Sequence, residues 1–219
     1  MIIINGDFLC RNLTGIERFA FETCKHLDSL IEKNQIGIYI PKNAKTIPDY
    51  NNIKVIISKK ECKVFPLWEH LEFGKFVKTN KYTPLDFSNV TPLGTKGIVF
   101  IHDIYAKLYS KDFSRFRDKL INKYMCLMYR YATKHAKLLL TVSEFSRTQI
   151  ANTYKIPKEK IYVIPNGWDH FKEIQPDNSI IKNNPKLQDN FYFTLGSLSL
   201  RKNLKWVAEY AKNNQNENF

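Results

Sequence analysis

The sequence predicts an α/β fold: a Rossmann-like parallel sheet with helices on both faces, followed by a fragment of a second lobe. Segments with strand and helix character alternate along the first part of the chain, which is typical of a parallel sheet covered on both faces. Residues 97–101 form a continuous apolar run, as expected for a strand buried on both faces. A polar segment without periodicity then precedes a new strand pattern at residues 191–195, which indicates that a second lobe begins there.

The expected strands are short apolar segments bounded by polar or turn residues. They cover residues 1–5, 35–41, 53–57, 85–87, 97–101, 137–142 and 161–164. We expect the strands near Ile3, Phe100, Leu139 and Val163 to be central in the sheet.

The expected helices carry apolar residues at helical spacing. They open at residue 14, cover residues 66–78 and 112–135, follow residue 143 and open again at residue 203. In the first helix, Ile16, Phe19 and Leu27 fall on one face. Ser143 is expected to cap the helix that follows it, because its hydroxyl can accept a free backbone N–H of the first turn.

The composition divides the chain into three parts. Residues 1–171 hold the expected sheet and form an N-terminal Rossmann-like lobe. Residues 172–190 contain Pro176, Pro185 and many polar residues, so we expect an interdomain linker. Residues 191–219 hold one strand and one helix, which cannot bury their own apolar faces. We therefore expect residues 191–219 to be the truncated start of a second lobe.

The charge and the cysteines argue against several classes of protein. The 219 residues are 43% hydrophobic, enough for a full core, and their net charge is +13. That charge favours an anionic partner such as a nucleotide diphosphate, an anionic membrane surface or nucleic acid, and the sequence contains no recognisable nucleic-acid module. The four widely spaced cysteines include no CxxC pair, which argues against a metal site and a disulfide framework. We find no secretory signal and no membrane-spanning stretch, and expect a cytoplasmic protein.

Ligands of open α/β sheets bind at the carboxyl ends of the strands, where the sequence places Gly15, Asn89, His102 with Asp103, and Ser143. Gly15 opens a helix whose free N–H groups and dipole favour a phosphate, although an ordinary turn glycine would read the same. Asp103 could orient the His102 ring or fix its tautomer, and the alternative is a purely structural histidine. Ser143 is first of all a helix cap.

Four short motifs follow one another along the chain, at residues 101–103 (IHD), 141–146 (TVSEFS), 161–167 (IYVIPNG) and 195–203 (LGSLSLRKN). Together they resemble a retaining GT-B glycosyltransferase, with glycosyltransferase family 4 as the closest group. The first three resemble the acceptor lobe, and the last resembles the loop that opens the donor lobe. The resemblance implies transfer of a hexose from a nucleotide-diphosphate sugar to a cell-envelope glycan or lipid-linked acceptor, without a metal ion or another cofactor.

The same resemblance implies roles for individual residues. His102 would contact the transferred sugar, and Gly15 would lie by the donor diphosphate. Arg201 and Lys202 would neutralise the diphosphate as it leaves, a charge-assisted contact that is strongest in a closed cleft; a solvated basic loop is the alternative. The candidates for the acceptor site or the cleft are Asn89, Asp103 and Ser143.

The sequence departs from the family pattern in two places. Gly196 is followed by Ser197, where many members have arginine, so the phosphate role would fall on Arg201 and Lys202. The paired glutamates that hold the sugar and the nucleotide in the family would lie beyond Phe219. We therefore expect the chain to be inactive as a catalyst by itself.

The long helix expected at residues 112–135 carries a basic stripe. Its basic residues fall within an arc of about 100° by the helical repeat. They are Arg115, Lys119, Lys123, Arg130 and Lys134, with Lys137 just past the expected end. One interpretation is attachment to an anionic lipid surface, at the inner face of the cell membrane; the other is a solvated charged face.

These observations lead to one leading hypothesis and two alternatives. We interpret the chain as a fragment of a cytoplasmic glycosyltransferase of polysaccharide biosynthesis. A sugar-nucleotide epimerase shares the two-lobe architecture, and a truncated lobe could also act as a non-catalytic glycan-binding remnant. An epimerase would interconvert the free nucleotide sugar without an acceptor, a transferase would need one, and a binding module would hold glycan without turnover.

Overall fold

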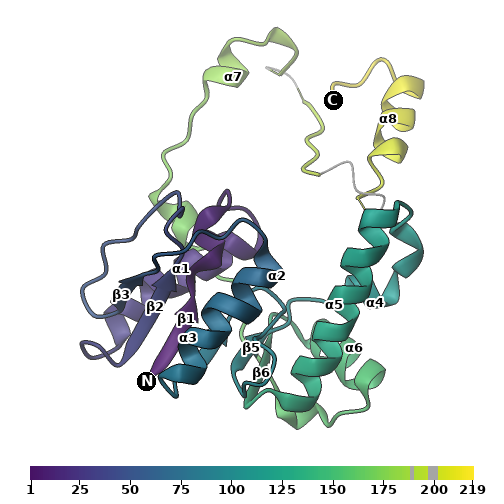
Figure 1. The fold of residues 1–219 in the computed structure, drawn as a ribbon. Helices are drawn as coiled ribbons and strands as arrows, with labels where there is room; N and C mark the ends of the chain where they lie inside the picture. The colour runs from purple at the N-terminus through teal and green to yellow at the C-terminus, as the bar shows by residue number, and fades with distance from the viewer. Residues whose placement is uncertain (188–189, 197–201) are drawn as a thin grey trace. The chain divides into compact units, whose positions relative to one another are not determined.

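The computed structural model describes residues 1–187, 190–196 and 202–219 (Figure 1). The chain divides into two compact units, Met1–Gly167 and Trp168–Phe219. The first unit contains the sheet and the long helices that cover it.

A parallel sheet forms the centre of the first unit. Within the described residues it has seven strands in the order β3-β2-β1-β4-β5-β6-β7, and every neighbouring pair is parallel. The strands are β1 Ile2–Asn5, β2 Ile36–Ile40, β3 Lys54–Ile57, β4 Thr83–Asp86, β5 Ile98–Phe100, β6 Leu138–Thr141 and β7 Ile161–Val163. The predicted fold class, an α/β Rossmann-like sheet, is confirmed.

One of the four strands expected in the centre lies at an edge. The strands that contain Ile3, Phe100 and Leu139 are interior, whereas the strand that contains Val163 is the outer strand β7. This strand has three residues, and Tyr162 in its middle is 56% exposed. An apolar run this short does not distinguish an edge strand from a buried one, which is why the sequence prediction was wrong here.

Helices cover both faces of the sheet. The α-helices of the first unit are α1 Ile16–Leu30, α2 Phe65–Leu67, α3 Gly74–Thr79, α4 Tyr105–Leu108, α5 Phe116–His135 and α6 Glu144–Tyr154. Tighter and wider helical turns are η1 Gly6–Cys10, η2 Trp68–Phe73, η3 Ser110–Asp112 and η4 Lys158–Lys160, of which η2 is a π-helix and the others are 3-10 helices. The long helix α5 starts later than the expected residue 112, because η3 ends there.

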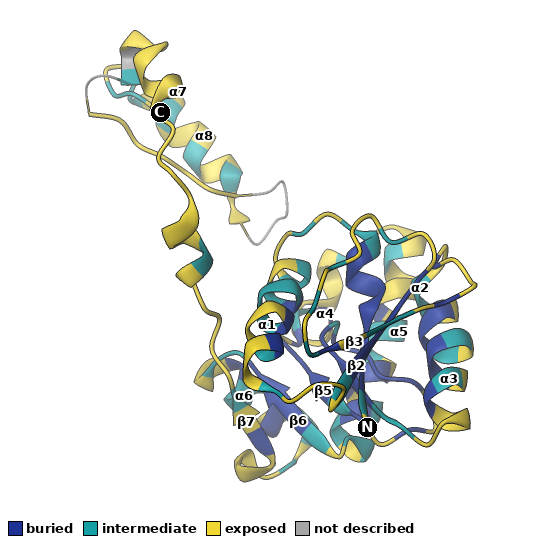
Figure 2. Cartoon of the chain, turned by 90° about the vertical axis from the view of Figure 1, so that its left-hand side faces the viewer, coloured by how far each residue is buried: buried dark blue, intermediate teal, exposed yellow. Residues whose placement is uncertain are grey.

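The side chains of each strand alternate between the two covered faces, as the pleat of a strand requires. Ile4 and its register partner Ile38 pack with Ala20 of α1. Ile3 instead packs with Trp68 of η2. Figure 2 shows the strands as the most deeply buried elements, between helices whose outer faces are exposed.

The far half of the sheet has its own core. Val99 of β5 and its register partner Leu139 of β6 are buried with Tyr129 and Ala132 of α5 and with Ile150 of α6. Because α5 and α6 are anchored here, the carboxyl ends of β5 and β6 are held in place. Those ends carry two of the predicted site residues, His102 and Ser143.

Residues 65–79 form one helical run with a π-helical centre. α2 leads into η2, and η2 leads directly into α3. The helix predicted over residues 66–78 is therefore confirmed, and Gly74 belongs to it. A Cβ at Gly74 would lie 3.0 Å from Cβ of Pro92, so a glycine allows this close approach.

The second unit is mostly exposed. Its helices are η5 Asp169–Glu173, α7 Ser179–Lys182, η6 Pro185–Leu187 and α8 Leu204–Asn213. Phe191 forms an isolated parallel bridge with Asn218, and the backbone N–H of Tyr192 donates to the Asn218 carbonyl at 2.8 Å. The Tyr192 and Phe219 rings stack with their centroids 5.1 Å apart. The expected linker thus contains short helical turns, and the strand pattern at residues 191–195 is represented by this one bridge.

Candidate functional site

The carboxyl ends of the strands meet at one edge of the sheet, and the strand order reverses there. The chain runs outward from β1 through β2 to β3 and then returns to place β4 on the other side of β1. In open α/β sheets, ligands bind at such a reversal. The candidate residues Gly15, Asn89, His102 and Ser143 follow β1, β4, β5 and β6 and therefore belong to this edge.

Gly15 stands at the start of α1 in a backbone conformation that glycine adopts readily. Its φ is +55° and its ψ is −116°. No side chain of the described residues caps α1, and apart from the chain neighbours of Gly15 no described atom lies within 4 Å of the position that its Cβ would take. In the first turn the N–H of Glu17 donates to the Thr14 carbonyl at 3.2 Å. The uncapped helix start with open space beside Gly15 is a setting that favours an anion.

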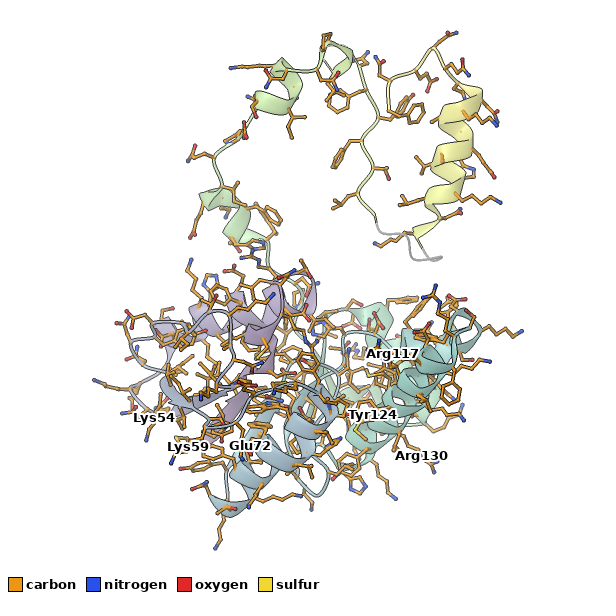
Figure 3. All side chains as sticks on the ribbon, turned by 45° about the horizontal axis from the view of Figure 1, so that its top comes forward. Lys54, Lys59, Glu72, Arg117, Tyr124 and Arg130 are labelled. Atoms are coloured by element: carbon orange, nitrogen blue, oxygen red, sulfur yellow. The ribbon has the colours of Figure 1, made fainter. Side chains whose placement is uncertain are left out.

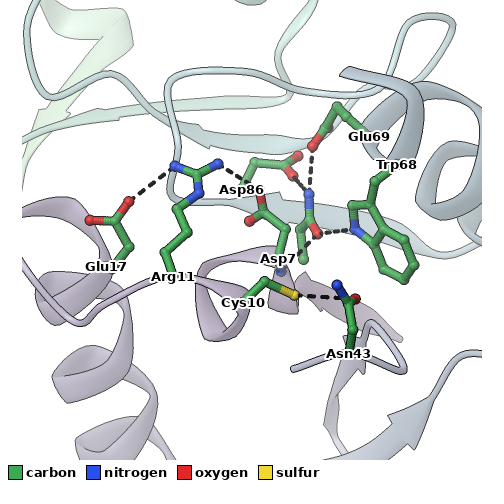
Figure 4. A network of polar contacts seen from close by, with 9 residues as sticks. Asp7, Cys10, Arg11, Glu17, Asn43, Trp68, Glu69 and Asp86 are labelled. Atoms are coloured by element: carbon green, nitrogen blue, oxygen red, sulfur yellow. Dashed lines mark hydrogen bonds and ion pairs between the residues drawn. The ribbon is translucent and has the colours of Figure 1, made fainter. Parts of the chain in front are cut away.

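Arg11 holds the loop that carries Gly15. Its guanidinium is 3.2 Å from a carboxylate oxygen of Asp7 in η1 and 3.0 Å from one of Glu17 in the first turn of α1 (Figure 4). The same group lies over the Phe65 ring, 3.7 Å from its centroid. Arg11 thus joins the end of β1 to the start of α1, with Gly15 between the two contacts along the chain.

His102 is buried and held through both its backbone and its ring. Its backbone N–H donates to Oδ1 of Asn89 at 2.7 Å, and its Nε2 lies 3.0 Å from the carbonyl oxygen of Phe87. Because a carbonyl can only accept, Nε2 carries the hydrogen. Burial lowers the pKa of His102, so the ring is neutral and Nδ1 keeps its lone pair. Within the described chain, Nδ1 has no hydrogen-bond partner.

Asn89 and Asp103 support this arrangement differently from the sequence hypothesis. Asn89 has a φ of +65°, and its own N–H donates to the Phe100 carbonyl at 3.1 Å, so it fixes the loop against β5. Asp103 accepts the N–H of Tyr105 at 2.9 Å, at the start of α4. The group that orients the ring and sets its tautomer is therefore the carbonyl of Phe87, although the charge of Asp103 does act to raise the His102 pKa.

Ser143 is a helix cap, as predicted. Its Oγ accepts the backbone N–H of Ser146 at 3.1 Å in the first turn of α6.

Phe19 brings α1 and His102 together, since its ring meets the imidazole edge to face with the centroids 5.0 Å apart. The structure therefore groups Gly15, Asn89 and His102 around the first turns of α1. Lys202 is exposed in the second unit, and Arg201 lies outside the described residues.

A buried polar network lies at the switch point, the place beside β1 where the strand order reverses. The sequence analysis did not predict it. Asn5 ends β1 and Asp86 ends β4, the strand beside it. The amide of Asn5 donates to Asp86 at 3.2 Å and to Glu69 of η2, and its oxygen accepts from Nε1 of Trp68 at 2.9 Å (Figure 4). All four side chains are at most 3% exposed.

Burial keeps Glu69 and Asp86, the two acids of this network, protonated at neutral pH. It raises the pKa of Asp86 to about 8 and that of Glu69 well above its usual range. Burial raises the pKa of the neighbouring Asp7 to about 6, so this carboxyl group is ionised at pH 7 and pairs with Arg11. The charge of Asp86 is a second cause that raises the pKa of Glu69, and Oε1 of Glu69 and Oδ2 of Asp86 are buried without a hydrogen-bond partner in the described structure. The network is thus close to neutral. Among the described residues, no group of three or more His, Cys, Asp or Glu side chains is arranged to hold a metal ion.

The exposed face of α5 is basic and apolar at once. Phe116, Leu120 and Leu127 are 78%, 52% and 57% exposed. Four basic side chains of this face are also exposed, namely Lys119, Lys123, Arg130 and Lys134. By the helical repeat these seven residues share an arc of about 100°. Figure 3 labels Arg130 on this helix.

The two tyrosines that border this face are partly buried. Tyr124 contacts Nε2 of His70 at 3.1 Å, and Tyr131 accepts the N–H of Gly94 at 2.7 Å. They anchor α5 to its neighbours and leave the basic and apolar face free. In the described part of the chain, no helix has both the length and the apolar character needed to cross a membrane.

Comparison with known proteins identifies most of the first unit. A family model described as Glycosyltransferase Family 4 matches residues 13–170. This range begins just before Gly15 and includes Asn89, His102 and Ser143. No curated protein matches the sequence.

Proposed function

The chain belongs to glycosyltransferase family 4, and from this we propose that it transfers a hexose, with retention, from a nucleotide-diphosphate sugar to a cell-envelope glycan or a lipid-linked acceptor. The observation that carries the proposal is the His102 ring. It is neutral, its tautomer is set by the Phe87 carbonyl, and its Nδ1 is unused at the edge of the sheet where ligands bind. A preorganised acceptor of this kind suits a sugar hydroxyl.

We assign the donor and acceptor contacts as follows. The free N–H groups at Gly15 bind the donor diphosphate, and Arg201 with Lys202 neutralise it as it leaves. His102 contacts the transferred sugar. Asn89, Asp103 and Ser143 belong to the cleft or the acceptor site, with Asn89 acting through the backbone of His102. This assignment uses no metal ion and no cofactor.

The proposal also covers the domain organisation. Residues 1–171 would be the acceptor lobe of a GT-B fold, residues 172–190 a linker, and residues 191–219 the start of a donor-binding lobe. The separate compact unit at residues 168–219 supports a boundary in this region. Under this proposal, transfer requires a complete donor lobe.

A transfer assay tests the proposal. The 219-residue chain and a fusion that supplies a family 4 donor lobe are incubated with labelled nucleotide-diphosphate sugars, with and without lipid-linked acceptors. We expect label in the lipid fraction with the fusion, and only when an acceptor is present. Interconversion of the free donor without acceptor would indicate an epimerase, and acceptor binding without turnover in the fusion would indicate a binding module.

We also propose that the basic and apolar face of α5 binds the anionic inner surface of the cell membrane, which would keep the enzyme near a lipid-linked acceptor. Exposed lysine and arginine attract acidic headgroups, and the three apolar side chains between them can enter the headgroup region. Because the surface charges are screened over about 10 Å at 0.1 M salt, binding should weaken as salt rises.

Flotation with anionic vesicles tests this contact. Replacing Lys119, Lys123, Arg130 and Lys134 by Gln should reduce binding strongly. A variant with the same loss of charge elsewhere serves as the control and should bind like the wild type. Its replaced residues are the exposed Lys42, Lys54, Lys59 and Lys60, of which Figure 3 labels two. Equal loss in both variants would mean that net charge, and not this face, attracts the membrane.

A further inference from the structure

Two cysteines that are distant in the sequence lie together beside the buried network. Cys10 ends η1, and Cys62 lies in the loop between β3 and α2. Sγ of Cys10 is 3.7 Å from Oδ1 of Asn43 (Figure 4). The same oxygen accepts the backbone N–H of Cys62 at 2.8 Å. Nδ2 of Asn43 also donates to the Cys62 carbonyl at 3.3 Å. One asparagine therefore contacts both cysteines, and Cys10 packs against the hydrophobic cluster that contains Cys62.

The two thiols differ in access. Cys62 is 5% exposed and belongs to a hydrophobic cluster with Trp68 and Phe73. Cys10 packs against the outside of that cluster and is partly exposed. A small solute thus reaches Cys10 first, because Cys62 is buried in the cluster against which Cys10 packs.

The charges around Cys10 favour its thiolate. The hydrogen bond from Cys62 is the largest cause that lowers the pKa of Cys10, and the cationic groups of Arg11 and Lys45 act in the same direction against burial and the charge of Asp7. The same hydrogen bond and burial raise the pKa of Cys62.

The two other cysteines lack this activation. Burial raises the pKa of Cys24 to about 12, and it also raises the pKa of Cys126. All four cysteines are free thiols in the described structure. Cys10 is therefore the one whose surroundings combine partial exposure with a stabilised thiolate, which is the setting of reactive cysteines.

We propose that Cys10 and Cys62 form a peroxide-sensitive dithiol, in which Cys10 attacks the oxidant and Cys62 resolves the product. The Cys10 thiolate attacks one oxygen of hydrogen peroxide; the S–O bond forms, the O–O bond breaks, and hydroxide leaves. Sulfur is oxidised to the sulfenic acid, and the peroxide is reduced. The Cys62 sulfur then attacks Sγ of Cys10; the S–S bond forms, the S–O bond breaks, and the departing hydroxide takes the Cys62 proton as water.

The modification would act on a functionally placed segment. Closing the bond brings the sulfurs to about 2.05 Å, so η1 and the loop before α2 must be drawn together. Arg11, which braces the Gly15 loop, is the next residue after Cys10. Disulfides of this kind in reducing compartments are usually transient and sense the redox state. The inference goes beyond glycosyl transfer and does not depend on it.

Peptide mapping of the oxidised protein tests the dithiol directly. The reduced 219-residue chain is treated with hydrogen peroxide, blocked with N-ethylmaleimide under denaturing conditions and digested. We expect a peptide pair joined between residues 10 and 62, with Cys24 and Cys126 alkylated. Full alkylation of all four thiols after peroxide treatment would overturn the proposal.

Single substitutions assign the two roles. With dimedone present, Cys62→Ser should accumulate a dimedone adduct on Cys10, because the sulfenic acid then has no resolving partner. Cys10→Ser should lose both the adduct and the joined peptide, whereas Cys126→Ser, which removes another partly exposed thiol, should behave like the wild type. An adduct on Cys126 in preference to Cys10, or a joined peptide in Cys10→Ser, would reject the assignment without bearing on transferase activity.

Discussion

Two buried polar sites lie at the same edge of the sheet, and burial has made both of them neutral. In the Asn5 network it raises the pKa of the carboxyl groups, and at His102 it lowers the pKa of the imidazole. They differ in whether the central side chain keeps a hydrogen-bonding atom without a partner in the described structure. Asn5 is bonded to Glu69, Asp86 and Trp68, whereas the His102 ring makes one hydrogen bond, to Phe87, and keeps Nδ1 free in the described structure.

This difference separates a structural network from a candidate functional side chain. The Asn5 network joins β1, β4 and η2, so its hydrogen bonds hold three elements at the switch point together. The His102 ring packs against Phe19 and Phe100, and the carbonyl of Phe87 orients it. Substitutions in the network should therefore change stability, and substitutions of His102 should change function.

The largest effect is expected for Asn5→Ala. It leaves the Trp68 N–H unpaired in the core and removes the shared donor of Glu69 and Asp86. Each buried polar group left unpaired costs about 1–3 kcal/mol, so the free energy of unfolding should fall by roughly 3 kcal/mol or more in urea titrations. Asn122→Ala is the matched control, because this buried asparagine donates to one carbonyl, that of Ala106. Equal losses of unfolding free energy in the two variants would show that the network stabilises the fold no more than a single buried hydrogen bond does.

His102→Phe should give the largest change in rate. The ring keeps its contacts with Phe19 and Phe100 while both nitrogens are lost. In a fusion with a complete donor lobe, turnover should fall on the order of 10²-fold, the usual cost of one preorganised polar contact. The melting temperature should change little. His70→Phe, a histidine substitution on η2, should leave turnover unchanged; an unfolded His102→Phe variant or one with full turnover would make His102 structural.

The pH dependence of stability should report the proton bound by Asp86. Asp86 binds a proton in the folded state up to about pH 8, whereas an unfolded aspartate loses it near pH 3.8. The folded state holds more protons in that interval, so stability falls as pH rises, by up to ~1.4 kcal/mol per pH unit for one proton. Glu69 and Asp7 are the titratable groups that act on the pKa of Asp86.

Asp86→Asn tests this expectation, because the amide keeps the Oδ1 acceptor for Asn5 and no longer titrates. The free energy of unfolding, measured in urea between pH 5 and pH 8, should depend less on pH in this variant than in the wild type. His102 is present in both proteins, so its contribution cancels in the difference between the two curves. Parallel curves would mean that Asp86 is ionised in the folded protein.

Ser143→Ala should have the smallest effect. It removes the hydroxyl that accepts the Ser146 N–H at the start of α6, and the loss of such a cap costs about 1 kcal/mol. Thermal unfolding measures it. No change in stability would show that water replaces the cap.

The fold was largely predictable because apolar segments and their ends carry the signal. The apolar run that contains Val99 and Phe100, and the serine cap at residue 143, identify β5 and α6 from local chemistry. The place of a strand in the sheet is a non-local property, and for this reason Val163 was placed wrongly. The π-helical turn at η2 was also unpredictable, since no local residue requires it.

Candidate site residues could be predicted where they lie in the loop that follows a strand. Gly15, Asn89 and His102 were proposed in this way, and the rule would also have pointed to Asn5 and Asp86, which end two strands. Glu69 and Arg11 could not be found so, because a π-helical turn and a 3-10 turn bring them to the site. The backbone carbonyl that orients His102 belongs to Phe87, and carbonyl positions leave no trace in a sequence.

The backbone at Gly15 has a consequence for handedness. Its φ of +55° and ψ of −116° are the mirror image of an extended conformation that L residues adopt freely. The position is thus selective for chirality rather than for size, since open space surrounds the missing Cβ. In a chain assembled by chemical ligation, D-alanine would meet the backbone requirement that L-alanine fails. The right-handed helix α1 thus begins directly after a residue with positive φ.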